Sequence, residues 1–365
     1  MNIAIDARII STSTGRYVER LITYLEKIDQ TNTYTVLVLE KDKHYWQPTH
    51  KNFRVVVANY RPQSFSEQLG FLIFLYRHKF DLVHFSMFNQ PILYFKKHVT
   101  TVHDLTIIRT YNSDKNWLTF HLKQFVARFV FLIVSQTSAH IITPSQFTKD
   151  DYVKLTGIKA SRVTVTYEAA DSLAISPEPY PPLSDQQFIL YVGNQSDYKN
   201  IKSLISAHQQ LLHTHPSLQL VLAGKIDKAA QMNRDWVKEK GYENIVFTGF
   251  VDDQILTWLY RHCQVYVFPS LMEGFGLPGL EAMVEGAPVA CSNASCLPEV
   301  YGDAAQYFDP LNPIDMAHVI DSFLQSKTLR TEFSARGKKH VTTYSWQRLA
   351  EQTYRLYLSI TKPKI

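Results

Sequence analysis

The sequence predicts an α/β protein with two domains, each built around a parallel β-sheet. Three observations predict this architecture. The chain has 365 residues, more than one hydrophobic core usually holds. Short apolar stretches alternate with helical stretches, as is typical of parallel strands joined by crossover helices. A segment with four prolines at residues 176–182 interrupts the alternation, which is typical of a linker.

The first domain is expected to span residues 1–170, followed by a linker at 171–186. Its predicted strands are at residues 2–7, 35–39, 53–58, 81–85, 99–102, 139–143 and 162–167. Its predicted helices follow the loop at residues 12–17 and occupy residues 64–77, 115–136 and 145–155. The serine at position 145 is a typical helix N-cap.

The second domain is expected to span residues 187–345. A separate terminal helix is expected to follow in residues 346–365. Its predicted strands are at residues 188–193, 218–223, 245–248, 265–268 and 288–292. Its predicted helices begin after Lys199 and at Pro278, and two more occupy residues 315–325 and 329–340. Proline is tolerated at a helix start because the N–H that it lacks would be unpaired there.

The composition is that of a compact protein, with 45% hydrophobic and 19% charged residues. A net charge of +5 suits phosphates, nucleic acid or an anionic membrane, but the cations are scattered and no nucleic-acid motif is present, so we expect no nucleic-acid partner. Three cysteines are too few for a disulfide framework or a four-ligand zinc site. Asp6 and Arg8 interrupt the apolar N-terminus, so we expect no signal peptide and a cytoplasmic protein.

The residues from 265 to 286 form a candidate anion site. A strand, a glycine-bearing loop and a helix start follow one another, and the free N–H groups and positive dipole end of such a helix attract a phosphate. Glu273 and Glu281 lie eight positions apart, and Glu281 should lie roughly 6 Å beyond the helix start. Carboxylates accept hydrogen bonds from hydroxyls, so the layout matches a diphosphate flanked by a ribose and a sugar.

This stretch, FPSLMEGFGLPGLEAM, is followed by Gly286, Pro288 and the segment LPEV at residues 297–300. It resembles the Glu-x7-Glu signature of glycosyltransferase family four, the glycosyl transferases group 1. The resemblance implies the GT-B fold, with two Rossmann-like domains facing a central cleft. The first would be the acceptor domain, to which the C-terminal helix at residues 346–365 crosses back, and the second would be the donor domain that binds the nucleotide sugar. It also implies a retaining enzyme that moves a hexose from a nucleotide diphosphate sugar, of the GDP-mannose or UDP-glucose type, to an acceptor hydroxyl. Polysaccharide, glycolipid or cell-envelope glycan synthesis would be its setting.

The resemblance also implies roles for the residues of this motif. Glu273 would grip hydroxyls of the sugar, and Glu281 would grip the ribose diol. The sugar and the phosphates would be held by backbone N–H groups of the loop and helix start, at Gly274, Phe275, Gly276 and Leu277. No Asp-x-Asp sequence is present, so we expect neither a metal nor a cofactor, and the departing phosphate oxygen would take the acceptor's proton.

A second phosphate cradle follows the strand at residues 188–193. Gly193 and Asn194 begin its loop, and the family resemblance places Lys199 on the donor diphosphate. An arginine that the family often carries in this loop is absent, so either Arg16 or Lys225 would supply the second charge. The nucleobase would lie near the backbone of Phe250 and Val251.

Two features of the first domain are expected to complete the site. Gly15 lies at a strand-to-helix junction, where the family has a glycine loop facing the donor phosphates, although a plain tight turn explains it equally well. His103 and Asp104 follow a strand at the edge where such sheets bind ligands. The resemblance implies that His103 reaches the donor sugar, with Asp104 orienting it or its loop. His84 is a weaker candidate of the same kind.

The predicted helix at residues 115–136 is unusually aromatic and carries interspersed cations. It is either an interfacial helix that contacts an anionic membrane, at the inner face of the plasma membrane, or a long helix packed on the sheet. The apolar run is expected to be too short and too interrupted to span a bilayer. The acceptor would be a glycan or a lipid-linked glycan. The remaining alternatives are a nucleotide-sugar epimerase, a phosphorylase, or a catalytically silent nucleotide-sugar-binding partner.

Overall fold

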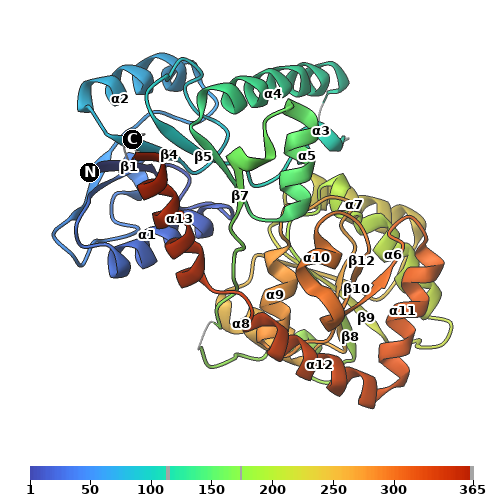
Figure 1. The fold of residues 1–365 in the computed structure, drawn as a ribbon. Helices are drawn as coiled ribbons and strands as arrows, with labels where there is room; N and C mark the ends of the chain where they lie inside the picture. Colours follow the sequence, from blue (N-terminus) through green and yellow to red (C-terminus); the bar gives the residue numbers. More distant parts are fainter. Residues whose placement is uncertain (112–115, 173–174, 362–365) are drawn as a thin grey trace. The chain divides into compact units, whose positions relative to one another are not determined.

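The computed structural model describes residues 1–111, 116–172 and 175–361, and these form two compact units (Figure 1). Unit 1 comprises residues 1–108, 123–168 and 345–361 of the described chain. Unit 2 comprises residues 109–111, 116–122, 169–172 and 175–344. The sequence-based boundary at residue 170 differs from this division mainly at residues 109–122, which are assigned to unit 2.

Unit 1 is built on a seven-stranded parallel sheet with the order β3-β2-β1-β4-β5-β6-β7. Ile3 of β1 pairs with Tyr34 of β2 on one side and with Leu82 of β4 on the other. The chain therefore changes direction across the sheet between β1 and β4, and such a switch point is where open α/β sheets bind ligands. The strands are β1 (Asn2–Asp6), β2 (Thr33–Val38), β3 (Phe53–Val57), β4 (Leu82–Phe85), β5 (His98–Thr101), β6 (His140–Thr143) and β7 (Val163–Val165).

The helices of unit 1 cover both faces of this sheet. The predicted helix at residues 64–77 is instead a π-helical turn (Glu67–Phe71) followed by α2. The helix predicted at residues 115–136 would begin at Lys115, which lies outside the described residues. The helices are α1 (Gly15–Ile28), α2 (Leu72–His78), α5 (Gln146–Thr156) and α13 (Trp346–Thr361), with 3-10 turns at Glu40–Asp42 and Ala160–Arg162. Two more, α3 (Thr106–Arg109) and α4 (Trp117–Thr137), belong to unit 1 except for Arg109 and residues 117–122, which are in unit 2. The terminal helix α13 packs against α1, as the family resemblance implied.

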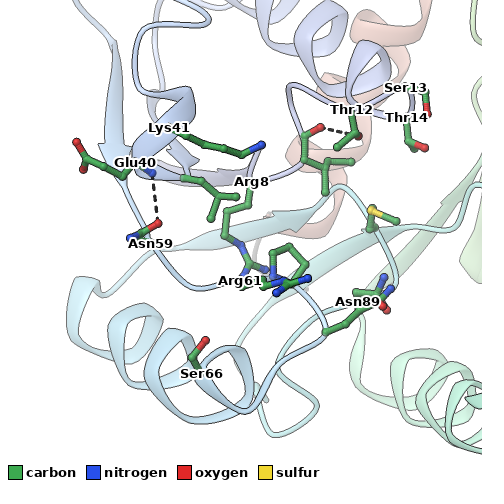
Figure 2. Close-up of a pocket in the computed structure, with 15 residues that line it drawn as sticks. Arg8, Thr12, Ser13, Thr14, Glu40, Lys41, Asn59, Arg61, Ser66 and Asn89 are labelled. Atoms are coloured by element: carbon green, nitrogen blue, oxygen red, sulfur yellow. Dashed lines mark hydrogen bonds between the residues drawn. The ribbon is translucent and has the colours of Figure 1, made fainter. Parts of the chain in front are cut away.

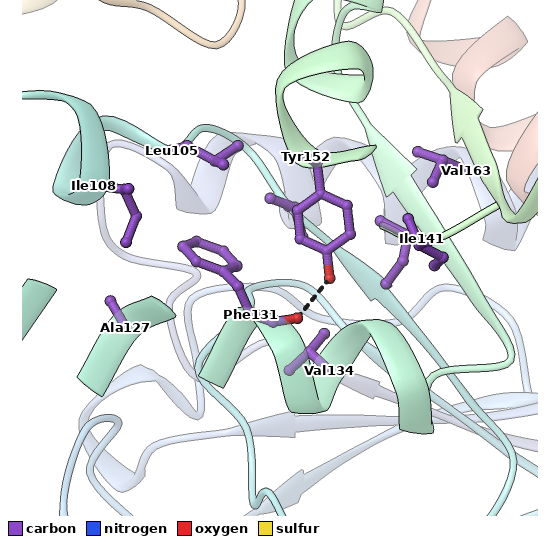
Figure 3. Close-up of a cluster of buried hydrophobic side chains, with 10 residues drawn as sticks. Leu105, Ile108, Ala127, Phe131, Val134, Ile141, Tyr152 and Val163 are labelled. Carbon is purple, nitrogen blue, oxygen red and sulfur yellow. Dashed lines mark hydrogen bonds between the residues drawn. The ribbon is translucent and has the colours of Figure 1, made fainter. Parts of the chain in front are cut away.

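One core of unit 1 lies between α4, α5 and the sheet (Figure 3). Ala127, Phe131 and Val134 recur at helical spacing on the buried face of α4, and the Tyr152 hydroxyl of α5 donates to the Phe131 carbonyl at 3.1 Å. This face of α4 is therefore a packed core face.

Unit 2 is built on a six-stranded parallel sheet with the order β10-β9-β8-β11-β12-β13, so its switch point lies between β8 and β11. The two predicted parallel sheets are confirmed. The strands are β8 (Phe188–Val192), β9 (Gln219–Ala223), β10 (Ile245–Gly249), β11 (Val265–Phe268), β12 (Val289–Ser292) and β13 (Ala305–Phe308). The helices are α6 (Ile201–Leu211), α7 (Lys228–Lys240), α8 (Asp253–His262), α9 (Leu277–Val284), α10 (Leu297–Tyr301), α11 (Pro313–Gln325) and α12 (Lys327–Val341), with 3-10 turns at Pro181–Leu183, Asp197–Lys199 and Gly302–Ala304.

Candidate functional site

The loops that follow β8, β11 and β12 are bonded to one another at the switch point of unit 2. The Leu271 N–H donates to the Tyr198 carbonyl at 2.8 Å, and the Glu273 N–H donates to the Ser295 hydroxyl at 3.2 Å. The side-chain amide of Asn200 donates to the carbonyls of Pro269 and Pro310. Residues far apart in the sequence are thereby fixed at one edge of the sheet.

Lys199 and Glu273 form an ion pair at this edge. The Lys199 ammonium lies 2.5 Å from a Glu273 carboxylate oxygen, and the two side chains are only 10% and 13% exposed. Burial alone would lower the pKa of Lys199, but the charge of Glu273 outweighs it and raises the pKa above its ordinary value. Lys199 is therefore a fixed cation, held by Glu273 at the edge of the sheet.

The glycine loop leads into α9 in the predicted way, although the helix begins at Leu277, one residue before Pro278. Gly276 has φ of 95°, a conformation that favours glycine, and its carbonyl accepts from the Tyr301 hydroxyl. A Cβ atom at Gly279 would lie 2.3 Å from the same hydroxyl. These glycines let the first turn of α9 pack directly on Tyr301, with its N–H groups at the edge of the sheet.

Glu281 lies one turn into α9 and is half-buried, with an oxygen 3.5 Å from the Tyr260 hydroxyl. Phe275, in contrast, is buried and packs edge-on against Tyr344. Leu277 is half-buried, and Gly274 is buried. The side chain of Phe275 is therefore enclosed by the protein, and a ligand could contact this residue only through its backbone.

Three glycines end neighbouring strands of unit 2. The Gly193 N–H donates to Ala223 and the Gly224 N–H donates to Gly249, and a Cβ atom at Gly224 would lie 2.2 Å from the Gly193 carbonyl. Asn194 is exposed beside them, and its side chain accepts from the Ser196 N–H at 3.2 Å. Among the residues predicted near the phosphate and the base, Lys225 is exposed, Phe250 is 84% exposed and Val251 is half-buried.

His103 of unit 1 follows β5 and has partners on both ring nitrogens. Its Nε2 lies 2.9 Å from the Ser86 carbonyl and its Nδ1 lies 3.3 Å from a Glu168 carboxylate oxygen. Burial alone would lower the pKa of His103, but Glu168 and the Ser86 carbonyl raise it above its ordinary value. Glu168 was missed by sequence reasoning, although its place just after the predicted strand at residues 162–167 was a usable signal.

Asp104 and His84 make hydrogen bonds to other parts of unit 1. An Asp104 carboxylate oxygen accepts from the Thr106 N–H at 2.7 Å, so Asp104 shapes the loop at the start of α3. His84 is fully buried, with Nδ1 2.5 Å from the Tyr357 hydroxyl and Nε2 2.8 Å from the Thr101 hydroxyl. Burial lowers the pKa of His84 to about 3, so this ring is neutral.

Gly15 is explained by the packing of the chain on itself. A Cβ atom there would lie 2.2 Å from the Ile9 carbonyl oxygen and 2.3 Å from the Ile10 carbonyl oxygen. A tight turn is therefore sufficient to explain Gly15, and a contact of its loop with the donor phosphates stays a prediction. Arg16, the next residue, is exposed on the first turn of α1.

Comparison with known proteins identifies the family. Residues 14–172 match the model of Glycosyltransferase Family 4, and residues 175–340 match that of the glycosyl transferases group 1. The O-antigen chain mannosyltransferase B of Escherichia coli is 35% identical over 71% of this chain and 69% of its own length. The chain belongs to glycosyltransferase family 4.

Two further likenesses agree with this membership. The serotype-specific mannosyltransferase WbdA of Escherichia coli is 30% identical over 70% of this chain, although the match spans only 32% of that longer protein. The crystal structure of Anabaena Alr3699/HepE with UDP-glucose superposes with a TM-score of 0.78, at 15% identity, over 98% of this chain and 100% of that one. The fold is therefore GT-B, and the protein is a glycosyltransferase.

No cluster of three or more histidine, cysteine or acidic side chains able to hold a metal occurs among the residues that the structure of this glycosyltransferase describes. Its three cysteines are unpaired and buried, and burial raises the pKa of each thiol.

Helix α4 of the glycosyltransferase has a second apolar face opposite its core face. Its 21 residues are long and apolar enough to cross a membrane, so the expectation that the run was too short was wrong. Only 28% of that stretch is buried, so packing on the sheet accounts for the core face alone, and a membrane contact of the other face stays a prediction. Its exposed apolar side chains are Trp117, Leu118, Leu122, Phe125, Val126, Phe129 and Leu132.

Proposed function

We propose that this glycosyltransferase transfers mannose from a nucleoside diphosphate sugar to a hydroxyl of a growing glycan, with retention of configuration and without a metal ion. The Lys199–Glu273 pair carries the proposal, because it places a fixed cation and a hydroxyl acceptor at the switch point of the donor unit. The choice of mannose rests on the name of the Escherichia coli relative that is 35% identical.

Charge on the leaving diphosphate would be met by Lys199 and by the N-terminal turn of α9. An ammonium and oriented backbone N–H groups stabilise a developing negative charge without a metal. Glu273 holds Lys199 through one carboxylate oxygen, which leaves its second oxygen for sugar hydroxyls. In this arrangement the departing phosphate oxygen takes the acceptor's proton, and the chain supplies position and charge.

The ribose would bind Glu281, and the base would lie at the backbone of Phe250 and Val251. His103, held between Glu168 and Ser86, would contact the sugar from unit 1. Either Lys225 or Arg16, both of which are exposed, would meet the remaining phosphate charge.

We further propose that α4 contacts the cytoplasmic face of an anionic membrane. Its outer face carries exposed aromatic and aliphatic side chains together with Lys123 and Arg128, and residues 116–137 include no acidic residue. An apolar face with cations at its margin suits the headgroup boundary of such a membrane. A lipid-linked glycan would then be presented where the enzyme docks.

A panel of nucleotide sugars tests the proposed reaction. GDP-mannose should raise the melting temperature and be slowly hydrolysed, and hydrolysis should survive EDTA. Loss of turnover on chelation, restored by magnesium or manganese, would contradict the metal-free mechanism. Binding without any donor turnover would instead identify a catalytically silent partner, and a product that is not a glycoside would identify an epimerase.

A further inference from the structure

Three buried carboxylates of unit 1 lie beside nitrogen-bearing side chains. Asp6 and Glu67 accept from the guanidinium of Arg8 at 2.7 and 2.8 Å, where Arg8 lines a pocket of about 950 Å³ (Figure 2). The third, Glu168, lies just after β7 and is 5% exposed, with a carboxylate oxygen 3.3 Å from Nδ1 of His103. Neither Glu168 nor His103 lines that pocket. Burying an ionised carboxylate costs free energy unless a partner compensates it, and His103 is the partner of Glu168.

The chemistry of its two partners fixes the protons on the His103 ring. Nε2 lies 2.9 Å from the carbonyl oxygen of Ser86, which can only accept, so Nε2 carries a proton. An ionised carboxylate also only accepts, so Nδ1 carries a proton where it faces Glu168. Both N–H bonds of the ring are therefore directed at groups of unit 1.

A third group restrains the same ring from α1. The ring centres of Tyr17 and His103 lie 4.8 Å apart at an interplanar angle of 82°, which is an edge-to-face arrangement. The Tyr17 side chain is buried, and its hydroxyl oxygen lies 2.9 Å from that of Thr101, so the tyrosine is itself held in place. Ser86 follows β4, Glu168 follows β7 and Tyr17 belongs to α1, so three separate elements hold one imidazole.

We propose that Glu168 is a positioning residue of the glycosyltransferase reaction, which acts through His103 by holding its ring in one orientation with both nitrogens protonated. The ring then contributes a fixed positive charge beside the sugar and takes no part in proton transfer. This assignment deepens the proposed function and rests on the placement of His103 at the sugar. It agrees with the proposed transfer of the acceptor's proton to the phosphate oxygen, which needs no histidine base.

Removing the charge of Glu168 should change the ionisation of His103. Burial alone would lower the pKa of His103, and Glu168 is the main group that raises it, with smaller contributions from a backbone carbonyl and from Asp104. The neighbouring side chains of His84 and Tyr17 carry no charge at neutral pH, because burial lowers the pKa of His84 to about 3 and raises that of Tyr17. Without the Glu168 charge the pKa of His103 falls, so the ring loses its positive charge as the pH rises into the neutral range.

Steady-state hydrolysis of GDP-mannose at several pH values tests this role. Glu168→Gln keeps the size of the side chain but removes its charge, so its kcat should fall by roughly ten-fold as the pH rises from about 6 to about 8. The unchanged enzyme should show no such loss, and neither should Glu168→Asp, which keeps the charge. The KM for the donor should stay nearly constant, because the donor-binding groups of unit 2 are unaltered.

Nitrogen NMR of histidine-labelled protein measures the state of the ring without any turnover. The signals of His103 are those missing from the spectrum of His103→Gln. In the unchanged protein both ring nitrogens should remain protonated at about pH 7.5, whereas Glu168→Gln should have lost one of the two protons. The spectrum of the unchanged protein tests the proposal even where the Glu168 variant does not fold.

Two further variants separate positioning from a purely structural effect. Asp321→Asn is the matched control, since it makes the same carboxylate-to-amide change beside a histidine of unit 2, with 2.7 Å between Asp321 and Nε2 of His215. It should leave the rate and the pH profile unchanged. In the His103→Gln background, Glu168→Gln should cause no further loss of kcat, because Glu168 acts through His103.

Three results would overturn the positioning role. They are a Glu168→Gln variant with the pH profile of the unchanged enzyme, a full additional loss in the His103→Gln background, and a singly protonated His103 ring in the unchanged protein. An enzyme that turns over no nucleotide sugar contradicts the proposed function instead, and the NMR signals then still decide how Glu168 holds His103.

Discussion

The ammonium of Lys199 and the carboxylate of Glu273 lie 2.5 Å apart although 74 positions separate them in the chain. Both side chains are almost enclosed, so each neutralises a charge that would otherwise be costly to bury. The pair therefore has a structural role in unit 2 as well as the proposed role toward the donor.

Lys199→Met should destabilise unit 2 and abolish turnover, because it leaves the Glu273 charge buried and unpaired. Removing one partner of a buried pair costs about 3–5 kcal/mol, and the residual exposure places this loss at the low end. The double variant Lys199→Met with Glu273→Gln should recover much of the stability but no turnover.

Urea unfolding and donor hydrolysis on the same samples make this comparison. Arg336→Ala is the control, since its pair with Glu332 is about half-exposed and should contribute less than about 1 kcal/mol. A double variant as unstable as the single one, or one that regains turnover, would contradict the account of the pair.

Gly279→Ala should impair nucleotide binding as well as stability. The new Cβ atom would lie 2.3 Å from the Tyr301 hydroxyl, so the start of α9 must shift, at a cost of about 1–3 kcal/mol. Gly241→Ala is a matched control, because its Cβ atom would meet nothing and only backbone strain at φ of 64° is added. Thermal unfolding measures the stability of the two variants, and calorimetry with the nucleoside diphosphate measures their nucleotide affinity. Equal nucleotide affinity in both variants would show that the first turn of α9 does not contact the phosphates.

Acidification should destabilise unit 1 through His84. The unfolded chain takes up a proton on this residue near pH 6.5, but the folded protein does so only near pH 3. Stability is therefore lost as the pH falls through this window, by about 2 kcal/mol between about pH 7 and about pH 5. His103 has the opposite shift, so its contribution is lost as the pH rises.

Urea unfolding at several pH values, compared between His84→Gln and the exposed control His78→Gln, measures the His84 contribution. The other buried histidines contribute equally to both variants, so the difference in slope belongs to His84. Identical slopes for the two variants would show that His84 is not held neutral.

Binding to anionic liposomes should depend on the outer face of α4. Phe125 and Phe129 are 70% and 53% exposed, so Phe125→Gln with Phe129→Gln should reduce cosedimentation without loss of fold. Leu311→Gln changes an exposed apolar residue of unit 2 and should have no effect. Binding should fall as salt is raised, because Lys123 and Arg128 contribute electrostatically. Recovery of the unchanged protein in the supernatant, with and without lipid, would contradict the proposed contact.

Features that depend on local pattern were predictable from the sequence. Buried strands such as β1 and β11 are continuous apolar runs bounded by polar or glycine residues, and the turn from Gly276 into α9 follows from glycine and proline chemistry. The parallel direction of the strands follows from their alternation with helices and from the family resemblance.

Partnerships between distant residues were not predictable. The place of Glu168 after a strand made it a candidate, but nothing in the sequence pairs it with His103, and nothing pairs Glu67 with Arg8. The sequence could not assign α4 as either a core helix or a surface helix. Both of its faces are apolar, so periodicity could not distinguish the buried face from the exposed one. The close approach of Gly15 to the Ile9 and Ile10 carbonyls was likewise not predictable.

In the proposed site Glu273 binds the sugar and Glu281 binds the ribose. Because the ribose hardly changes on the way to the transition state, Glu281→Gln should weaken donor and free nucleotide alike. The sugar becomes positively charged, so Glu273→Gln should lower kcat while nucleotide affinity stays nearly intact. Glutamine keeps an oxygen that can accept from Lys199, which leaves that contact in place.

The most direct measurement is calorimetry of both variants with the free nucleoside diphosphate, beside their steady-state rates. Hydrogen bonds to charged groups contribute about 1.5–3 kcal/mol, so each loss should be on the order of ten- to a hundred-fold. We expect a loss of nucleotide affinity in Glu281→Gln alone and a loss of kcat mainly in Glu273→Gln. Equal weakening of the nucleotide by both substitutions, or two variants indistinguishable from the unchanged enzyme, would contradict it.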